Sequence, residues 1–351
     1  MSAVDSLGQP APGFTTAGRA RRERRFALVV VGLALVVAGL WWAMILIGQT
    51  PYTASEALAV ISGHQVPGAS FDIGEIRLPR ALVGLLSGMA LGMAGTTCQT
   101  MLRNQLASPD IIGITSGASA SAVFAILVLG WSGLGLNILA VICGITTALV
   151  IYLLSGSGRA QGGRLILIGI GISSMFTSVT SYLQIKANVY DVPKAMRWLS
   201  GSLSEAEWAQ VPILATALAL GGGALLVVAR DLRPLTLGEE AATGLGVSVW
   251  RTRLVLIIMM VALSAFATAA TGPIAFVSFL AGPLAARLVG RTDRTLLVPA
   301  ALMGAAIVLG GDLVGQNLMP AKLPVGVVTG MVGAPYLISQ LLRLNRQGAS
   351  A

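Results

Sequence analysis

The sequence predicts an all-α polytopic membrane protein with about ten transmembrane helices. Of its 351 residues, 55% are hydrophobic and only 11% are charged, whereas soluble globular chains carry about 25% charged residues. Several apolar stretches reach the length of about 20 residues that a helix needs to cross a bilayer, and the alternating pattern of a membrane β-barrel is absent. The composition therefore excludes a soluble globular protein, a disordered chain and, with only 2 cysteines, a disulfide scaffold.

The spans follow one another along the chain with mostly short connections. The first apolar stretch directly follows a run of arginines and is too long for the core of a cleaved signal peptide, so we expect it to be retained. The eighth stretch is shorter than the others. The predicted spans are 26–48, 80–102, 111–130, 135–155, 165–185, 210–229, 254–272, 274–289, 295–315 and 323–342. They divide the chain into a basic cytoplasmic tail (1–25), a transmembrane domain (26–343) and a C-terminal cytoplasmic tail (344–351).

The 23 basic residues are distributed unequally between the two sides of the predicted bundle. An even number of spans places both termini on one side, and that side receives 17 of the lysines and arginines against 6 on the other. Because positively charged loops stay in the cytoplasm, we expect both termini to be cytoplasmic. The orientation of the chain in membrane lipid then accounts for the net charge of +9. The positive charge therefore gives no reason to expect a nucleic acid partner.

The predicted spans carry no Asp, Glu, Lys, Arg or His near their middles. Proton-coupled transporters usually have such groups inside the membrane. The chain also lacks the G-x-x-x-x-G-K-[ST] motif of a P-loop, and it shows neither a nucleophile with a base nor a cluster of metal ligands. We therefore predict a membrane protein that is not an enzyme and takes no cofactor or metal; if it transports a substrate actively, the energy must come from a partner.

Small residues are frequent in the predicted spans. Gly84, Gly88 and Gly92 recur at four-residue spacing, which places them on one face of the second span and lets another helix approach closely. Two interpretations stay open: the row packs helices within one subunit, or it forms a smooth wall along a translocation path. The same two interpretations apply to Gln99, Asn104 and Gly169.

The longest loop on the side of the termini is 230–253. Pro234 can begin a short helix in this loop, and Gly246 can end it and allow a second short helix, Val247 to Arg251. Such a helix–glycine–helix knob has the form of a docking element, although an ordinary amphipathic loop is the alternative. The candidate coupling residues are Leu237, Gly238, Glu239, Glu240, Ala241, Ala242, Gly244 and Gly246.

Short motifs follow in a set order from about residue 70 to residue 343. They are R-L-P-R at 77–80, G-T-T-C-Q at 95–99, R-N-Q-L-A-S-P-D at 103–110, W-L-S-G-S-L at 198–203, L-G-E-E-A-A at 237–242, G-P-I-A-F-V at 272–277 and L-P-V-G-V-V-T at 323–329. In this order and topology the set resembles the FecCD-type ABC permeases, a family that imports iron–siderophore complexes, haem and cobalamin. The resemblance implies a type II ABC importer permease architecture and a location in the plasma (inner) membrane of a bacterium.

The resemblance also implies partners. A second permease subunit pairs with the first in that family, and the translocation path lies between the two. Two cytoplasmic ATPase subunits grip the loop that corresponds to 230–253, and a periplasmic or lipid-anchored substrate-binding protein delivers the cargo. ATP binding then drives alternating access, which agrees with the missing P-loop and with the candidate knob.

Arg77 and Arg80 receive a role from the same resemblance. In the family, the arginines of this motif bind acidic residues of the binding protein, because the planar guanidinium matches a carboxylate. The alternative is that both side chains only extend to the membrane interface. The family's further docking arginine near the end of the ninth span is missing, and Lys322 stands where an acidic residue is usual, so Lys322 can supply the charge. Such departures are easier to accommodate in one half of a heterodimer, which we expect in preference to a homodimer.

Four functions follow from these observations. The leading one is the permease of an iron–siderophore importer, and a haem or cobalamin importer of the same family is the second. The third is a secondary transporter that binds its coupling ion through backbone carbonyls. The fourth, a structural membrane scaffold, leaves the R-L-P-R motif without a role.

Overall fold

The computed structural model describes residues 12–110, 113–156, 161–229, 239–246, 248–290, 292, 294–319 and 321–348. These residues form helices joined by short loops, and no β-strand occurs among them. The helices are α1 (Pro12–Leu46), α2 (Ala54–Ile61), α3 (Ala69–Phe71), α4 (Leu78–Leu102), α5 (Ile114–Phe124), α6 (Leu134–Ser155), α7 (Gln161–Lys186), α8 (Val192–Leu199), α9 (Gln210–Ala217), α11 (Glu239–Gly244), α12 (Val249–Thr271), α13 (Val277–Val289), α14 (Leu297–Asn317) and α15 (Val325–Gly348). Three π-helical turns extend or precede them: η1 (Asp72–Arg77), η2 (Ala125–Leu129) and η3 (Leu218–Gly222).

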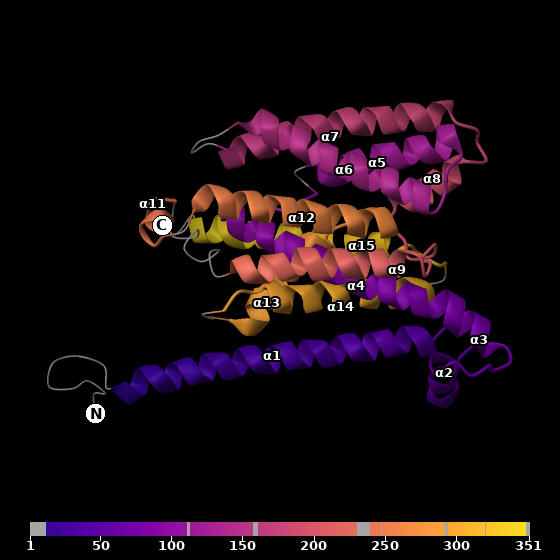
Figure 1. Ribbon diagram of the computed structural model, residues 1–351, viewed down its shortest axis with the longest axis horizontal. Helices are drawn as coiled ribbons and strands as arrows, with labels where there is room; N and C mark the ends of the chain where they lie inside the picture. The colour runs from indigo at the N-terminus through magenta and orange to yellow at the C-terminus, as the bar shows by residue number, and fades with distance from the viewer. Residues whose placement is uncertain are drawn as a thin grey trace.

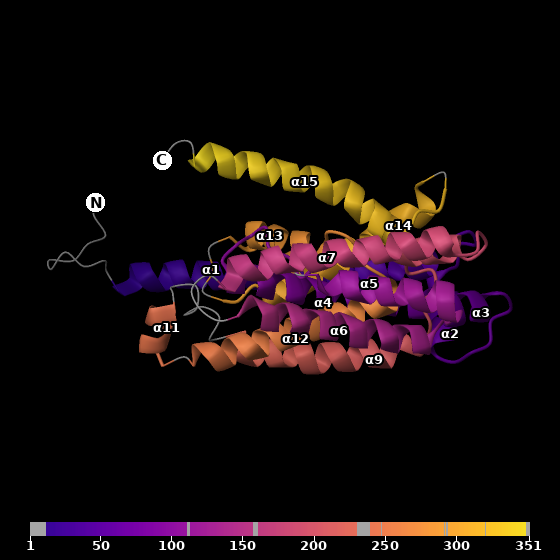
Figure 2. The same cartoon turned by 90° about the horizontal axis from the view of Figure 1, so that it is seen from above.

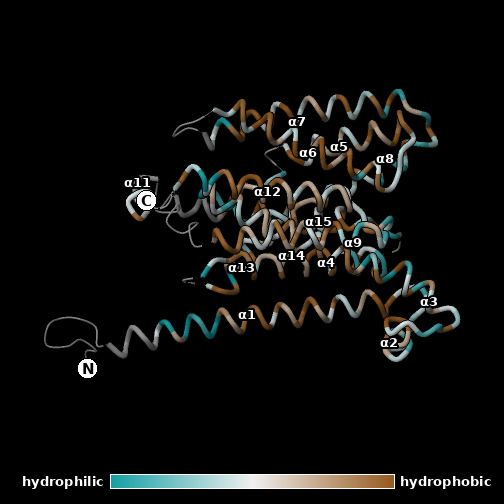
Figure 3. Tube along the Cα trace, in the orientation of Figure 1, coloured by the Kyte–Doolittle hydropathy of each residue, from teal (hydrophilic) through white to brown (hydrophobic). Residues whose placement is uncertain are grey.

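Each of the ten predicted spans corresponds to a helix. Eight helical segments among the described residues are long and apolar enough to cross a membrane, and two shorter apolar ones, Ile114–Leu129 and Val277–Val289, account for the third and eighth spans. The helices run side by side, and their apolar residues lie in the part of the bundle between its two ends (Figures 1 and 3). The predicted all-α polytopic membrane fold is therefore confirmed.

The centre of the bundle is α4. In α4, 78% of the residues along the apolar stretch are buried, because α14, α12 and α13 pack around it (Figure 1). The glycine row makes this possible: a Cβ atom on Gly88 would lie 2.7 Å from the Cα of Ala305, and one on Gly92 would overlap the carbonyl of Ala300. The row thus brings the backbones of α4 and α14 into contact.

Helices α5, α6, α7 and α8 form a second group beside this core (Figure 1). The short α5 packs between α6 and α7, and α6 also contacts α12. Where α5 begins, Gly113 has a φ of 90° and lies against the carbonyl of Gly169 in α7. A side chain at Gly113 would be strained there, so the close contact depends on glycine.

Three long helices lie at the periphery with little packing. Only 22%, 11% and 28% of the residues along the apolar stretches of α1, α7 and α15 are buried. Helix α15 starts against α14 and then diverges from the bundle toward its C-terminal end (Figure 2). Their unpacked faces are available to lipid or to another subunit.

The two ends of the bundle differ in character. On the terminal side lie the start of α1, the end of α15 and α11, and on the opposite side lie α2, α3 and α8 (Figure 1). Residues 12–25 of the predicted tail are helical and continuous with the first span. One expectation needs correction: the predicted separate helix Val247–Arg251 is wrong, because Val249 begins α12.

Candidate functional site

Arg77 is held inside the structure by a full set of partners. Its guanidinium donates hydrogen bonds to the carbonyl oxygens of Ile45 at 2.9 Å and Thr50 at 2.7 Å, and to a carboxylate oxygen of Asp72 at 2.6 Å. The ring of Tyr52 covers it at 4.8 Å, and only 8% of the residue is exposed. A buried charge needs such partners, so Arg77 fixes the end of α1 to the turn that precedes α4.

Arg80 forms a bidentate ion pair with Asp312. The Nε and Nη2 atoms donate to the two carboxylate oxygens, both at 2.8 Å. Asp312 is 2% exposed and lies in α14, so the pair joins α14 to the start of α4. This pairing could not be predicted from the sequence, because 232 positions separate the partners.

A cavity of about 470 Å³ lies beside the two ion pairs on the opposite side of the bundle. Arg77, Arg80 and Lys322 all line it, together with residues at the ends of α1 and α14. Lys322 is exposed and has no ion pair with any residue of the described ranges. The structure thus brings the three predicted docking residues to one cavity, where Lys322 is the accessible cation.

Three of the sequence motifs meet in a glycine-lined junction on the same side. Ser202 N–H donates to the carbonyl of Thr271 at 2.7 Å, and Gly326 N–H donates to that of Gly201 at 3.0 Å. Gly201 and Gly272 have φ values of 67° and 69°, in the left-handed region that favours glycine. The ends of α8 and α12 and the start of α15 are therefore joined backbone to backbone.

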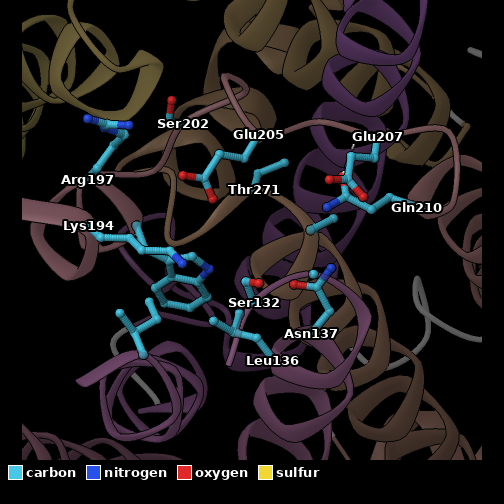
Figure 4. Close-up of a pocket in the computed structure, with 14 residues that line it drawn as sticks. Ser132, Leu136, Asn137, Lys194, Arg197, Ser202, Glu205, Glu207, Gln210 and Thr271 are labelled. Carbon is cyan, nitrogen blue, oxygen red and sulfur yellow. Dashed lines mark hydrogen bonds between the residues drawn. The ribbon is translucent and has the colours of Figure 1, made fainter. Parts of the chain in front are cut away.

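A second cavity, of about 330 Å³, adjoins this junction (Figure 4). Lys194 and Arg197 project from α8, whereas Glu205 and Glu207 project from the segment that precedes α9. None of the four forms an ion pair within the part of the chain that the structure describes. Because the charges balance, the cavity offers no net attraction for a charged ligand.

The candidate coupling knob lies on the terminal side. The backbones of Glu239 and Glu240 begin α11, whereas Leu237 and Gly238 lie outside the described residues. Ala242 is fully buried, but the apolar side chains of Leu245 and Trp250 are 64% and 69% exposed. Exposed apolar side chains at the end of a membrane bundle mark a surface that a partner can cover.

The remaining candidates make contacts within the subunit. Gln99 donates through Nε2 to the carbonyl of Phe279 at 3.0 Å, which joins α4 to α13. The side-chain oxygen of Asn104 accepts a hydrogen bond from the backbone N–H of Leu106 at 2.9 Å and shapes the loop after α4. Together with buried Gly169, these residues are placed in packing or turn positions.

Comparison with known proteins agrees with this arrangement of motifs. The profile of the FecCD transport family matches residues 34–343. The chain belongs to the FecCD transport family. Membership confirms the family that the motifs predicted, and it makes the chain a multi-pass membrane subunit of the ABC permease type.

FecCD relatives match over nearly the whole chain. The ferric enterobactin transport system permease protein FepG of Escherichia coli is 38% identical over 90% of this chain and 94% of its own length. The achromobactin transport system permease protein CbrC of Dickeya dadantii is 36% identical over 94% of this chain and 92% of its own length. An inward-facing metal-chelate type ABC transporter has a chain that superposes with a TM-score of 0.80 at 29% identity, covering 90% of this chain and 99% of that one.

One peripheral helix of this FecCD protein carries a polar face that the sequence analysis missed. Ser174, Thr177, Ser178 and Ser181 of α7 are exposed and recur at helical spacing. The first three donate hydrogen bonds to carbonyl oxygens four residues earlier, at 2.8 to 3.0 Å, so their hydroxyl groups are satisfied even in an apolar environment. Their spacing of three and four residues was the signal available in the sequence.

A partly buried carboxyl group in the R-N-Q-L-A-S-P-D loop, that of Asp110, makes stability depend on pH. Burial raises the pKa of Asp110 to about 6, although the Ser108 hydroxyl donates to it and opposes the shift. Because the pKa is raised, the folded state binds this proton more tightly than the unfolded state does. The resulting contribution to stability is fully present below about pH 4 and is lost as the pH rises through about 6. At pH 7.5 we expect Asp110→Asn to have a larger free energy of unfolding than the wild type, by up to about 3 kcal/mol, and therefore a higher unfolding temperature. At pH 4 we expect no such difference. A thermal unfolding series in detergent measures this, and equal differences at both pH values would contradict it.

Proposed function

We propose that this protein is the permease subunit of an ABC importer that moves an iron(III)–siderophore complex across the bacterial inner membrane. The observation that carries the proposal is the match with FepG, the ferric enterobactin permease, over nearly the full length of both chains. The achromobactin permease CbrC supports the same class of cargo. Both termini are cytoplasmic in this proposal, so the terminal side of the bundle faces the cytoplasm.

A second, distinct permease subunit completes the pathway. FepG and FepD are two permease proteins of one ferric enterobactin transport system, and this chain is 38% and 33% identical to them, which favours a heterodimer. The sparsely packed faces of α7 and α15 are the surfaces that such a partner can cover. The exposed hydroxyl groups along α7 then line a polar path between the subunits, and alternating access opens that path to each side in turn.

Two cytoplasmic ATPase subunits supply the energy and bind the knob at α11. Exposed Leu245 and Trp250 provide apolar contacts for them, and buried Ala242 fixes α11 against the start of α12. ATP-driven movement of the ATPase subunits is thereby passed to α12, which packs on the central α4.

Replacement of Leu245 by aspartate is expected to separate the permease from its ATPase. A charge in the centre of an apolar contact costs about 2 kcal/mol or more, which lowers ATPase recovery roughly thirty-fold. The measurement is co-purification from detergent extracts with quantitative mass spectrometry. Leu318→Asp is the matched control, because Leu318 is 75% exposed on the opposite side. If both variants retain the ATPase equally, the knob has no coupling role; Glu240→Arg is a second substitution within α11.

The substrate-binding protein docks on the opposite side, at the cavity shared by Arg77, Arg80 and Lys322. Its acidic residues meet exposed Lys322 first, while Arg80 is accessible only beside its bond to Asp312. We expect Lys322→Glu to weaken binding-protein capture about five-fold to thirty-fold, mainly through a slower association rate. Surface-immobilised permease complex and purified binding protein give this rate directly. Lys186→Glu, which changes a more distant lysine at the end of α7, is the control, and equal rates for the two variants would contradict the docking role.

Uptake assays decide between the open cargo classes. Cells that lack the gene are complemented with wild type and supplied with radioactive iron bound to catecholate or hydroxamate siderophores, with haem or with cobalamin. Restored uptake of the iron–siderophore complex alone supports the proposal, and uptake of haem or cobalamin instead would assign the second function. Transport that persists without every ATPase partner would favour an ion-coupled secondary transporter.

A further inference from the structure

The face of α1 that points away from the bundle is apolar along the membrane. Leu33, Val37 and Met44 are buried against the bundle. Leu28 and Leu35, on the other face, are 63% and 68% exposed. Since so little of α1 is packed, lipid is the natural neighbour of this outer face.

Two arginines continue the outer face beyond the apolar stretch. Arg24 lies four residues before Leu28, and Arg21 lies three residues before Arg24, so all three share one side of the helix. Both arginines are exposed, and neither has a hydrogen bond or ion pair with any residue that the structure describes.

The other arginines of the run have different surroundings. Arg25 donates two hydrogen bonds to the carbonyl of Leu288, at 3.1 and 3.0 Å, and thereby caps the end of α13. Arg19 lies 4.0 Å from Glu23 in the next turn. A purely topological role needs only the total positive charge, and it does not require two unpaired arginines on the lipid-facing side.

Contacts at the end of the apolar stretch set the depth of these arginines. Arg294 lies over the ring of Phe26 at 5.5 Å, which fixes this level of α1 to the loop after α13. With a helix rise of about 1.5 Å per residue, Arg24 and Arg21 lie about 3 and 8 Å beyond Phe26. The headgroup layer of a bilayer is roughly 5 to 8 Å thick on each side, so the backbone of both arginines lies within one headgroup thickness of Phe26, where the apolar stretch begins.

We propose that Arg21 and Arg24 bind the phosphate of an anionic phospholipid in the leaflet on the terminal side of the bundle. Guanidinium groups match phosphate oxygens in geometry and charge, and the acyl chain of the lipid lies along Leu28 and Leu35. This site is independent of the cargo and of the ABC partners, because it depends only on the membrane orientation of α1. It retains a specific lipid at the peripheral helix, which has few protein contacts of its own.

Lipid retention by the purified full-length protein tests the proposal. The protein, with any subunits that co-purify, is titrated with phosphatidylglycerol or phosphatidylcholine in detergent, and bound lipid is counted by native mass spectrometry. Each basic residue near anionic headgroups contributes about 1 kcal/mol, so Arg21→Gln with Arg24→Gln is expected to reduce the preference for phosphatidylglycerol about thirty-fold. Arg21→Lys with Arg24→Lys keeps the charge and is expected to keep most of the preference.

The matched control removes the same charge from the other side of the helix. Arg19→Gln with Arg22→Gln has the same three-residue spacing but lies on the side of α1 that continues to buried Leu33 and Val37, and we expect it to lower the preference much less than Arg21→Gln with Arg24→Gln does. Equal losses in the two double variants would reduce the effect to total charge and overturn the site. An unchanged preference in Arg21→Gln with Arg24→Gln would overturn it too, as would a loss of ATPase recovery in its place, which would assign this face to a protein partner. Arg24→Gln alone, expected to lower the preference about five-fold, replaces the double variant if that variant fails to insert.

Discussion

Replacement of Gly92 by leucine is expected to prevent the bundle from folding. A Cβ atom at this position would overlap the carbonyl of Ala300 and lie 3.3 Å from the Cα of Ala301. Both obstacles are backbone atoms of a packed helix, so no side-chain rotation can relieve the overlap. Overpacking in a core costs typically 1–3 kcal/mol and more when the backbone must move. We therefore expect a loss above about 4 kcal/mol, which is a large part of the roughly 5–15 kcal/mol by which folded proteins are stable.

The yield of monodisperse protein in mild detergent, followed by fluorescence-detected size exclusion, measures this loss. Gly32→Leu is the matched control, because Gly32 lies in the peripheral α1 and no atom of its surroundings lies within 4 Å of the place that a Cβ atom would take. It is expected to behave as wild type. A normal elution profile and thermal stability for Gly92→Leu would show that α4 and α14 do not approach as closely as the structure places them.

The glycine row also shows how far sequence alone leads. Four-residue spacing predicted a close helix approach at Gly84, Gly88 and Gly92, because this spacing is a local property of one helix. It could not identify α14 as the partner, since that contact depends on the packing of the whole bundle. Within the row, Gly84 differs from the others: a Cβ atom there would first meet side-chain carbons, of Leu203 at 2.8 Å and Leu309 at 3.2 Å.

Hydropathy, charge and motifs were sufficient for the fold class, the number of spans and the family. These signals are strong because the bilayer demands long apolar helices and because basic loops follow one simple rule. The limits of α1 were not predictable in the same way: the polar residues 12–25 have no apolar periodicity, yet they continue the helix of the first span.

The candidate sites show a different limit. Arg77 and Arg80 were selected for their side of the membrane and for a family resemblance, and nothing in their neighbourhood in sequence revealed that Arg77 is buried. The glycine junction likewise combines segments around Gly201, Gly272 and Gly326, whose motifs were recognised separately. Each motif was visible, but their meeting point is a property of the tertiary structure.

Replacement of Asp312 by asparagine is the second change expected to have a large effect. The largely buried guanidinium of Arg80 then lacks its counter-charge. Removal of one partner from a buried ion pair costs about 3–5 kcal/mol. The reason for a high cost here is geometric, because Asp312 accepts two hydrogen bonds at 2.8 Å and joins α14 to α4. We expect a lower unfolding temperature and reduced yield in detergent.

A double-mutant cycle separates this ion pair from other effects of the substitution. Arg80→Gln combined with Asp312→Asn removes both charges, and a neutral amide pair of similar shape can form in their place, so the double variant is expected to be more stable than Asp312→Asn alone by at least about 1 kcal/mol. Glu205→Gln is a control for the loss of one carboxylate on the same side, because Glu205 has no ion pair with any residue of the described chain. If the two single substitutions in the cycle were simply additive, the pair would not be coupled, and Asp312 would stabilise α14 by some other contact. A coupled pair also explains why docking must be tested at Lys322: loss of Arg80 would disturb the joint between α4 and α14 together with any surface that it offers to a binding protein.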